Sequence, residues 1–251
     1  MPWRRSDRIY YTIETNLHMT ERYVHLSPRL ESAISMIDPC GTIADIGCDH
    51  GRMAAALLQR NLCNQVIETD ISERSLIKAI NLLRHIKLDH AASFRLGSGF
   101  SVLDDSECDA VMLLGMGGTL MTRILLDASK PLKGAGYAIL QPMRAQADIR
   151  KYLHQNNYRI SDDRIVLEHG RFYQVLKAFP GNVQQPIPDG WPSGFYDLGF
   201  VSYLNGEKLL YDLAQYQLMQ YTSRLRDAMG SAGESALAEK ITSVRQVLNL
   251  L

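Results

Sequence analysis

The chain has 251 residues, 46% of them hydrophobic, which is enough to bury a full core. Its 27 basic and 27 acidic residues cancel, so no global charge signal points to nucleic acid. No apolar run reaches the roughly 18 residues of a membrane span, and the N-terminus lacks the apolar core of a secretory signal. The cysteines have neither C-x-x-C nor metal-ligand spacing, which favours reduced thiols in a cytoplasmic protein without a metal.

The N-terminal part of the chain is polar and shows no clear periodicity. We expect residues 1–25 to form an N-terminal extension, and Met19 is an alternative start. The pair Ser27-Pro28 is a typical helix start, a capping residue followed by proline in the first turn. The helical apolar pattern that follows ends at Pro39-Cys40-Gly41.

Strands and helices then alternate along the chain. The predicted strands lie near 42–47, 65–70, 92–96, 109–114 and 136–141, and the predicted helices near 52–60, 73–87, 118–128 and 146–156. Such alternation predicts a parallel, doubly wound sheet covered by helices.

A hairpin closes this pattern. Residues 158–167 and 172–179 are strand-like, and His169-Gly170 forms the turn between them. A terminal antiparallel hairpin is typical of class I methyltransferases and is absent from NAD-type domains. The predicted fold is therefore α/β, a Rossmann-like seven-stranded sheet of the kind that binds S-adenosylmethionine (SAM).

The C-terminal part differs in composition from the rest. Closely spaced prolines predict a linker over 181–205, after a methyltransferase domain over 26–180. Two amphipathic segments near 206–229 and 234–250 predict an antiparallel, coiled-coil-like helical hairpin over 206–251. This hairpin either packs against the main domain or takes part in binding.

The first strand leads into a glycine turn that carries acids. Asp45, Gly47, Asp49 and His50 lie between this strand and the next helix. A dinucleotide site requires G-x-G-x-x-G here, with no acid facing the pyrophosphate. Carboxylates instead suit a cationic ligand with amino and ribose groups, which indicates SAM. The alternative is an ordinary turn in an unrelated α/β protein.

The next two strands end in features that suit an adenosine. Asp70, followed by Ile71, lies about 20 residues after the glycine turn, where an acid typically accepts hydrogen bonds from a ribose diol. The alternative role of Asp70 is to cap the helix that starts near Ser72, and both roles stay open. Gly97-Ser98-Gly99 suits an adenine edge close to the backbone, or a flexible turn.

The fourth and fifth strands end in candidate substrate contacts. Gly115-Met116-Gly117-Gly118 has no donor side chain, so backbone groups must act there, and bare glycines admit a flat base. The alternative is a purely structural loop. Gln141-Pro142 offers an amide to a base edge, or serves turn geometry alone.

Together these motifs resemble the bacterial TrmK family of tRNA (adenine(22)-N1)-methyltransferases. The resemblance spans roughly 26–179, and the helical hairpin resembles that family's C-terminal coiled-coil domain. The matching motifs are Leu26-Ser27-Pro28-Arg29-Leu30, Ile43-Ala44-Asp45-Ile46-Gly47-Cys48-Asp49-His50, Arg95-Leu96-Gly97-Ser98-Gly99, Gly115-Met116-Gly117-Gly118, Leu140-Gln141-Pro142 and Phe172-Tyr173.

The resemblance implies methylation of adenine N1 in tRNA with SAM as cofactor, by a protein expected to be monomeric. The implied catalytic residues are Asp49, Gly115, Met116 and Gly117. The implied cofactor-binding residues are Asp45, Gly47, Asp49, His50, Asp70, Ile71, Gly97, Ser98, Gly99 and Gly115. The implied substrate-binding residues are Arg29, His50, Gly118, Gln141, Pro142 and Tyr173, with His50, Tyr173 or Phe172 as stacking partners of the base. Two other functions remain open, a SAM-dependent enzyme for a small molecule and a non-catalytic SAM-binding module.

Overall fold

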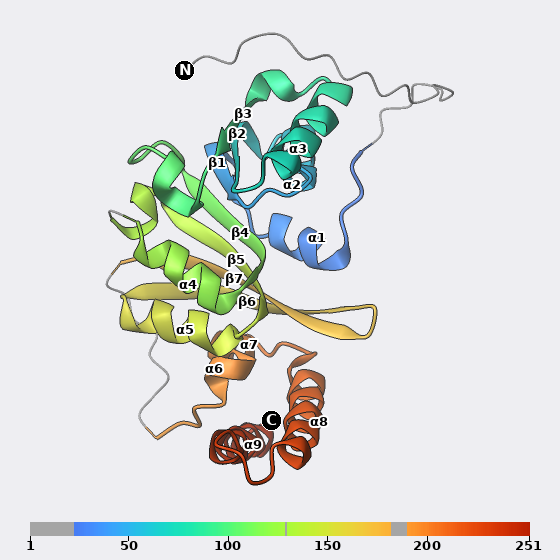
Figure 1. The fold of residues 1–251 in the computed structure, drawn as a ribbon, viewed down its shortest axis with the longest axis vertical. Helices are drawn as coiled ribbons and strands as arrows, with labels where there is room; N and C mark the ends of the chain where they lie inside the picture. The colour runs from blue at the N-terminus through green and yellow to red at the C-terminus, as the bar shows by residue number, and fades with distance from the viewer. Residues whose placement is uncertain (1–22, 129, 182–189) are drawn as a thin grey trace.

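The computed structural model describes residues 23–128, 130–181 and 190–251. Most of the expected N-terminal extension, with Met19, and the first part of the expected linker lie outside the described residues. Within them, seven strands form one sheet in the order β3-β2-β1-β4-β5-β7-β6 (Figure 1). Strands β1 to β5 run parallel, and β7 lies antiparallel between β5 and β6. The predicted fold class, with its terminal hairpin, is confirmed.

The elements follow the predicted alternation. The strands are β1 (Cys40–Ile46), β2 (Cys63–Asp70), β3 (Ala92–Leu96), β4 (Ala110–Gly117), β5 (Tyr137–Arg144), β6 (Tyr158–Glu168) and β7 (Arg171–Pro180). The α-helices are α1 (Pro28–Ile34), α2 (Arg52–Gln59), α3 (Glu73–His85), α4 (Gly118–Leu126), α5 (Gln146–Gln155), α6 (Phe195–Leu198), α7 (Phe200–Leu204), α8 (Leu210–Asp227) and α9 (Glu234–Leu248). Short 3₁₀ turns are η1 (Asp89–Ala91), η2 (Gly99–Val102) and η3 (Pro131–Gly134).

Helices cover both faces of the sheet, which explains why its central strands are largely apolar. One core joins the sheet to α4 and α5 through residues such as Met121 and Leu153. A second core joins the other face to α1, α2 and α3 through residues such as Ile34, Leu57 and Leu83. Strands buried on both faces carry near-continuous hydrophobic runs, as β1 and β4 do.

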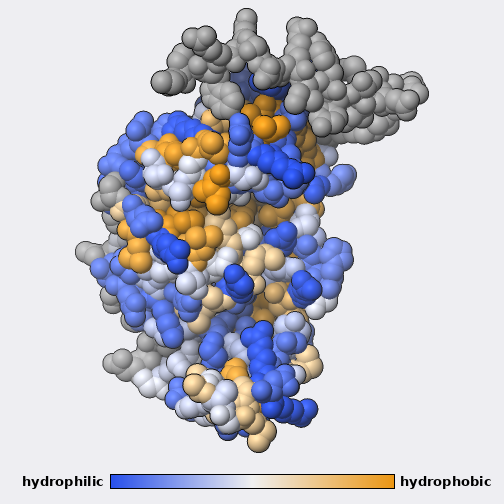
Figure 2. Space-filling view, viewed as in Figure 1, coloured by the Kyte–Doolittle hydropathy of each residue, from blue (hydrophilic) through white to orange (hydrophobic). Residues whose placement is uncertain are grey.

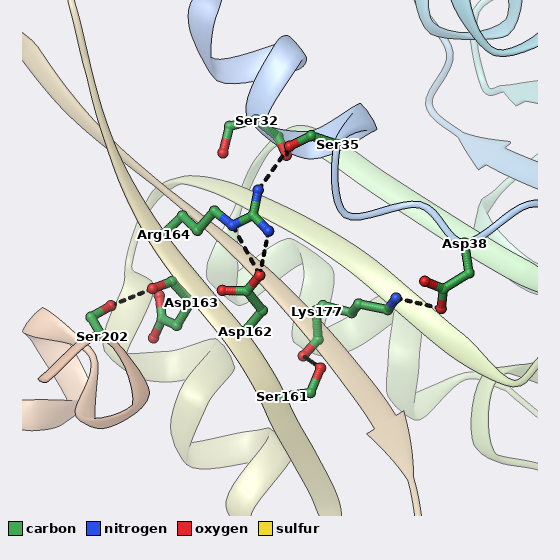
Figure 3. Close-up of polar contacts among 9 residues, drawn as sticks. All are labelled: Ser32, Ser35, Asp38, Ser161, Asp162, Asp163, Arg164, Lys177 and Ser202. Atoms are coloured by element: carbon green, nitrogen blue, oxygen red, sulfur yellow. Dashed lines mark hydrogen bonds and ion pairs between the residues drawn. The ribbon is translucent and has the colours of Figure 1, made fainter. Parts of the chain in front are cut away.

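Helix α1 is fastened to the last two strands by charged side chains (Figure 3). The guanidinium of Arg164 donates to Asp162 Oδ2 at 2.6 and 2.9 Å and to Ser35 Oγ, just after α1, at 2.8 Å. Lys177 Nζ lies 2.6 Å from Asp38 Oδ2. The start of the domain is thereby held against its final hairpin.

The C-terminal part differs from the prediction. Residues 195–204, expected within a linker, form α6 and α7, and Phe195, Leu198 and Phe200 are buried. They share a core with Ile165 of β6 and with α8 and α9, so the helical hairpin packs on the sheet through α6 and α7 (Figure 1). The prolines suggested a linker, but the aromatic side chains that follow supply a core.

The helical hairpin itself is close to its predicted bounds. The first helix begins at Leu210 rather than at residue 206, because the chain turns at Gly206, whose φ is 64°. Neither helix is long and apolar enough to cross a membrane, and the same holds for every other helix in the described residues.

Candidate functional site

A cavity of about 480 Å³ lies at the carboxyl ends of β1, β2 and β4. Most of the predicted site residues line it: Arg29, Asp45, Gly47, Asp49, His50, Asp70, Ile71, Gly97, Ser98, Gly99, Gly115 and Met116. Ligands of open α/β sheets bind at this edge, and the volume is that of a small-molecule site. Loops that are far apart in the sequence therefore meet in one place.

The first glycine turn is tied to the neighbouring strand. The backbone N–H groups of Gly47 and Cys48 both donate to the carbonyl of Thr69, at 2.8 and 3.0 Å. Gly47 has a φ of 79°, and a Cβ there would lie 2.1 Å from the terminal methyl of Met116. The positive φ favours glycine, whereas the flexible end of Met116 could move, so it is the backbone conformation that brings bare backbone to the wall of the cavity.

Asp49 and His50, which follow the first glycine turn, lie at the mouth of the cavity. His50 Nδ1 is 2.5 Å from Asp49 Oδ2, and the two side chains are about half and 70% exposed. The other ring nitrogen of His50 lies 3.0 Å from Lys78 Nζ. The carboxylate of Asp49 is therefore accessible to a ligand and already placed beside a titratable ring.

Asp70 joins the turns that follow the first three strands. Its Oδ2 accepts the Asp49 N–H at 3.2 Å, and its Oδ1 accepts the Ser72 N–H at 2.8 Å. Its backbone carbonyl accepts the Gly97 N–H at 3.0 Å. The helix cap itself is the Ser72 hydroxyl, which accepts from the Ser75 N–H at 3.3 Å. Asp70 thus holds the loops together and still lines the cavity.

Two buried acids lie side by side on neighbouring strands, and one of them, Asp45, lines the cavity. Asp45 and Glu68 are paired in register on β1 and β2, 3% and 0% exposed. Burial, together with the nearby carboxylates of Asp70 and Asp49, raises the pKa of Asp45 to about 7. Burial, then the charge of Asp45, raises the pKa of Glu68 well above its usual range. Glu68 is not among the residues predicted from the sequence, although an acid inside an apolar strand is a visible signal.

Gln141 has a different role from the predicted one. It is fully buried, and its Oε1 accepts hydrogen bonds from the Gly115 N–H and from Arg29 Nη1, both at 3.1 Å. The amide is therefore engaged inside the protein rather than presented to a base edge. Gly115 and Arg29 line the cavity, so Gln141 supports the wall from behind.

Several other predicted substrate contacts lie outside the cavity lining. Gly118 is buried, and a Cβ there would lie 2.1 Å from the Ala145 carbonyl, so it allows α4 to approach the turn before α5. Phe172 packs on Tyr216 of α8, with ring centroids 5.3 Å apart. Tyr173 lies under the Arg29 guanidinium at 5.3 Å. Pro142, and Gly117 from the predicted catalytic residues, are also outside the lining.

Apolar side chains at the rim were largely missed. Ile71, Leu120 and Met143 line the cavity and are 77%, 45% and 41% exposed. Hydrophobic residues gather over the region of α4 in the space-filling view (Figure 2). The rim thus offers apolar surface beside carboxylates.

No cluster of three or more metal-binding side chains occurs within the described ranges.

Comparison with known proteins places this geometry in a family. A family model described as a methyltransferase domain matches residues 26–176, so the chain belongs to the methyltransferase domain family. It is 31% identical over 157 residues to the tRNA (adenine(22)-N(1))-methyltransferase of Bacillus subtilis. That alignment covers 62% of this chain and 66% of the relative.

Solved structures of the same group have the same fold. The TrmK structure from B. subtilis has a TM-score of 0.77 at 23% identity, covering 90% of this chain and 99% of that one. The structure of Mycoplasma capricolum TrmK in complex with S-adenosyl-homocysteine has a TM-score of 0.78 at 19% identity, covering 90% and 98%. The resemblance to the TrmK family predicted from the motifs is confirmed.

Proposed function

We propose that the protein methylates N1 of an adenine in tRNA, adenine 22 by its resemblance to the TrmK family, with SAM as the methyl donor. The observation that carries this proposal is the single cavity that unites Asp45, Asp49 and Asp70 with the glycine loop at Gly115. Similarity to the B. subtilis enzyme supports the choice of a tRNA adenine. Because the proposed substrate is tRNA, we propose that the protein acts in the cytoplasm. We also propose that it acts as a monomer.

The residues present fit SAM. Gly47, Gly97 and Gly99 give the cavity walls without side chains, and Ile71 offers an apolar face for an adenine. Asp70 retains acceptor capacity for a ribose diol, since a carboxylate has about four lone-pair sites and only two are used. Bound there, SAM would supply a methyl group activated by a positively charged sulfur.

The protein's own residues mainly have to position the adenine and stabilise the charge that develops on it. Adenine N1 already carries a lone pair, so no base is needed before attack, and positioning can supply most of the rate. As the N–C bond forms the C–S bond breaks, and positive charge passes to the base. The exposed carboxylate of Asp49 can stabilise that charge and then accept the N6 proton. A paired adenine hides N1, so the nucleotide must leave its stack first.

Methyl transfer from labelled SAM to unmodified tRNA transcripts tests the function, with nucleoside mass spectrometry of the product. We expect N1-methyladenosine, and loss of it in Asp49→Ala while SAM binding persists. Asp89→Ala serves as control, because Asp89 does not line the cavity and pairs only with Arg84 among the ion pairs of the described chain.

The alternatives give different results in the same assay. Transfer to no tRNA, with clear SAM binding, would contradict the proposal and favour an enzyme for a small molecule. Binding of SAM with no transfer to any acceptor would favour a non-catalytic module. Methylation at another atom of adenine would keep the assignment as a tRNA methyltransferase and change only the atom that is methylated.

A further inference from the structure

The wall of the cavity contains a bulge in β4. Leu114 pairs with Gln141 and Met116 pairs with Pro142, so Gly115 between them has no partner on β5. A bulged residue leaves the ladder, and Pro142 has no N–H with which to continue it. Gly115 has a φ of 74° and is exposed, and no described atom lies within 4 Å of the position of a Cβ. Its outer side is open toward the cavity that it lines.

The Gly115 N–H, which the bulge leaves without a partner on β5, donates to a side chain instead. Gln141 Oε1 accepts it at 3.1 Å, and the same oxygen accepts Arg29 Nη1 at 3.1 Å. Gln141 Nε2 is directed at the Pro142 carbonyl, at 3.3 Å. Two donors on one oxygen leave the buried amide a single orientation, because reversing it would face donors with donors.

Arg29 is itself held from two sides. Its backbone N–H donates to Glu168 Oε2 at 3.0 Å, and its Nε lies 3.5 Å from Glu168 Oε1. The ring of Tyr173 lies 5.3 Å from the guanidinium carbon, within the range of a cation–π contact. The end of β6 and the start of β7 thereby fix a side chain that reaches across to β5.

We infer that Arg29 and Gln141 are positioning residues that hold the Gly115 peptide in place on the wall of the methyl-transfer site. This inference rests on the proposed function. Because a trans peptide is planar, fixing the Gly115 N–H against Gln141 also fixes the Leu114 carbonyl, which points away from Gln141. Neither side chain needs to touch the base to determine where this peptide lies.

The test compares variants that break the contact with variants that keep it. We expect Arg29→Met and Gln141→Met to lower kcat for tRNA methylation about 10- to 100-fold, since a misplacement of about 1 Å has this effect. The Kd for SAM should change less than about threefold. Gln141→Glu should retain more of kcat than Gln141→Met, because a carboxylate accepts from both donors, but less than the wild type, because its second oxygen faces the Pro142 carbonyl. Arg29→Lys should recover part of kcat.

Arg164→Met is the matched control. Arg164 also joins the α1 segment to β6, through Ser35 and Asp162, but contacts neither Gln141 nor Gly115 among the described residues. If the effect of Arg29 came only from the placement of α1, the control variant would lower kcat equally. Equal losses in both variants, or a wild-type kcat in Arg29→Met, would overturn the inference.

Hydrogen exchange of the Gly115 amide gives a second readout that needs no activity. We expect exchange in Gln141→Met to be at least about tenfold faster than in the wild type and in Arg164→Met. Unchanged protection would overturn the inference even if kcat falls. If the wild type transfers no methyl to tRNA, the proposed function fails, and Gly115 exchange alone then decides whether Arg29 and Gln141 hold this peptide.

Discussion

Arg150 of α5 and Asp163 of β6 form a two-pronged ion pair in the interior. Arg150 Nε lies 2.9 Å from Asp163 Oδ2, and Arg150 Nη2 lies 2.8 Å from Asp163 Oδ1. The two side chains are 3% and 0% exposed. Arg150 Nη1 also donates to the Tyr196 carbonyl of α6 at 3.1 Å. One guanidinium thus connects the sheet, a covering helix and the C-terminal helical part.

Arg150→Met should therefore destabilise the protein strongly. Removing one partner leaves Asp163 buried without its counter-charge, which typically costs about 3–5 kcal/mol in the free energy of unfolding. Urea denaturation followed by circular dichroism measures this. The control is Arg84→Met, whose side chain is 67% exposed and pairs with Asp89, and it should cost less than about 1 kcal/mol. Similar losses in both variants would show that burial of the pair does not matter.

A second prediction concerns Gly118 at the start of α4. Since a Cβ there would lie 2.1 Å from the Ala145 carbonyl, Gly118→Ala must push α4 away from the turn before α5. We expect a loss of about 1–3 kcal/mol in the free energy of unfolding, as for other overpacked sites. Gly233→Ala, where the nearest atom would be 3.7 Å away, should be close to neutral in the same measurement. If Gly118→Ala leaves the free energy of unfolding unchanged, the packing role is contradicted, and Gly118 again becomes a candidate substrate contact.

The residues that the sequence predicted for the cofactor line the cavity, whereas several of those predicted for the substrate lie outside its lining. Asp45, Gly47 and Asp70 stand at strand ends, and strand ends of a parallel sheet meet at one edge, so local patterns sufficed. The role of Gln141 depends on the register of β5 against a bulged β4, which no local pattern encodes. Helices α6 and α7, of four and five residues, are too short for a periodic signal.

The third prediction is that Asp70 is required for SAM binding. Asp70→Ala removes the acceptor proposed for the ribose diol and also releases the Asp49 N–H. We expect Kd for SAM to rise about 10- to 100-fold, the equivalent of one or two charge-assisted hydrogen bonds. Isothermal titration calorimetry measures this, with Asp89→Ala as the control. An unchanged Kd would mean that Asp70 only ties the loops together.

The fourth prediction follows from the raised pKa of Asp45. Burial, then the charges of Asp70 and Asp49, brings its pKa to about 7 in the folded protein, well above the usual value for an aspartate. The folded state therefore holds a proton that the unfolded state has released. Stability should fall as the pH rises from about 4 to 7 and stay low above it.

Asp45→Asn tests this sign because an amide does not titrate. At pH 8 and without ligand, we expect the free energy of unfolding of the variant to exceed that of the wild type by up to about 4 kcal/mol, the scale set by a pKa raised from the usual aspartate value to about 7. At pH 5 the difference should shrink. Denaturation curves at the two pH values measure it, and a variant that gains nothing at pH 8 would contradict the assignment.

The contacts of α1 also determine the order in which the domain can be completed. Its segment is bound by residues 129 positions later at Ser35 and 139 positions later at Asp38. Contacts so distant along the chain form slowly, because a long loop must close first. During synthesis the α1 segment therefore lacks these partners until the β6–β7 hairpin has been made. Completion of the domain therefore depends on this hairpin, which both pairs β7 with β5 and supplies the partners of Ser35 and Asp38.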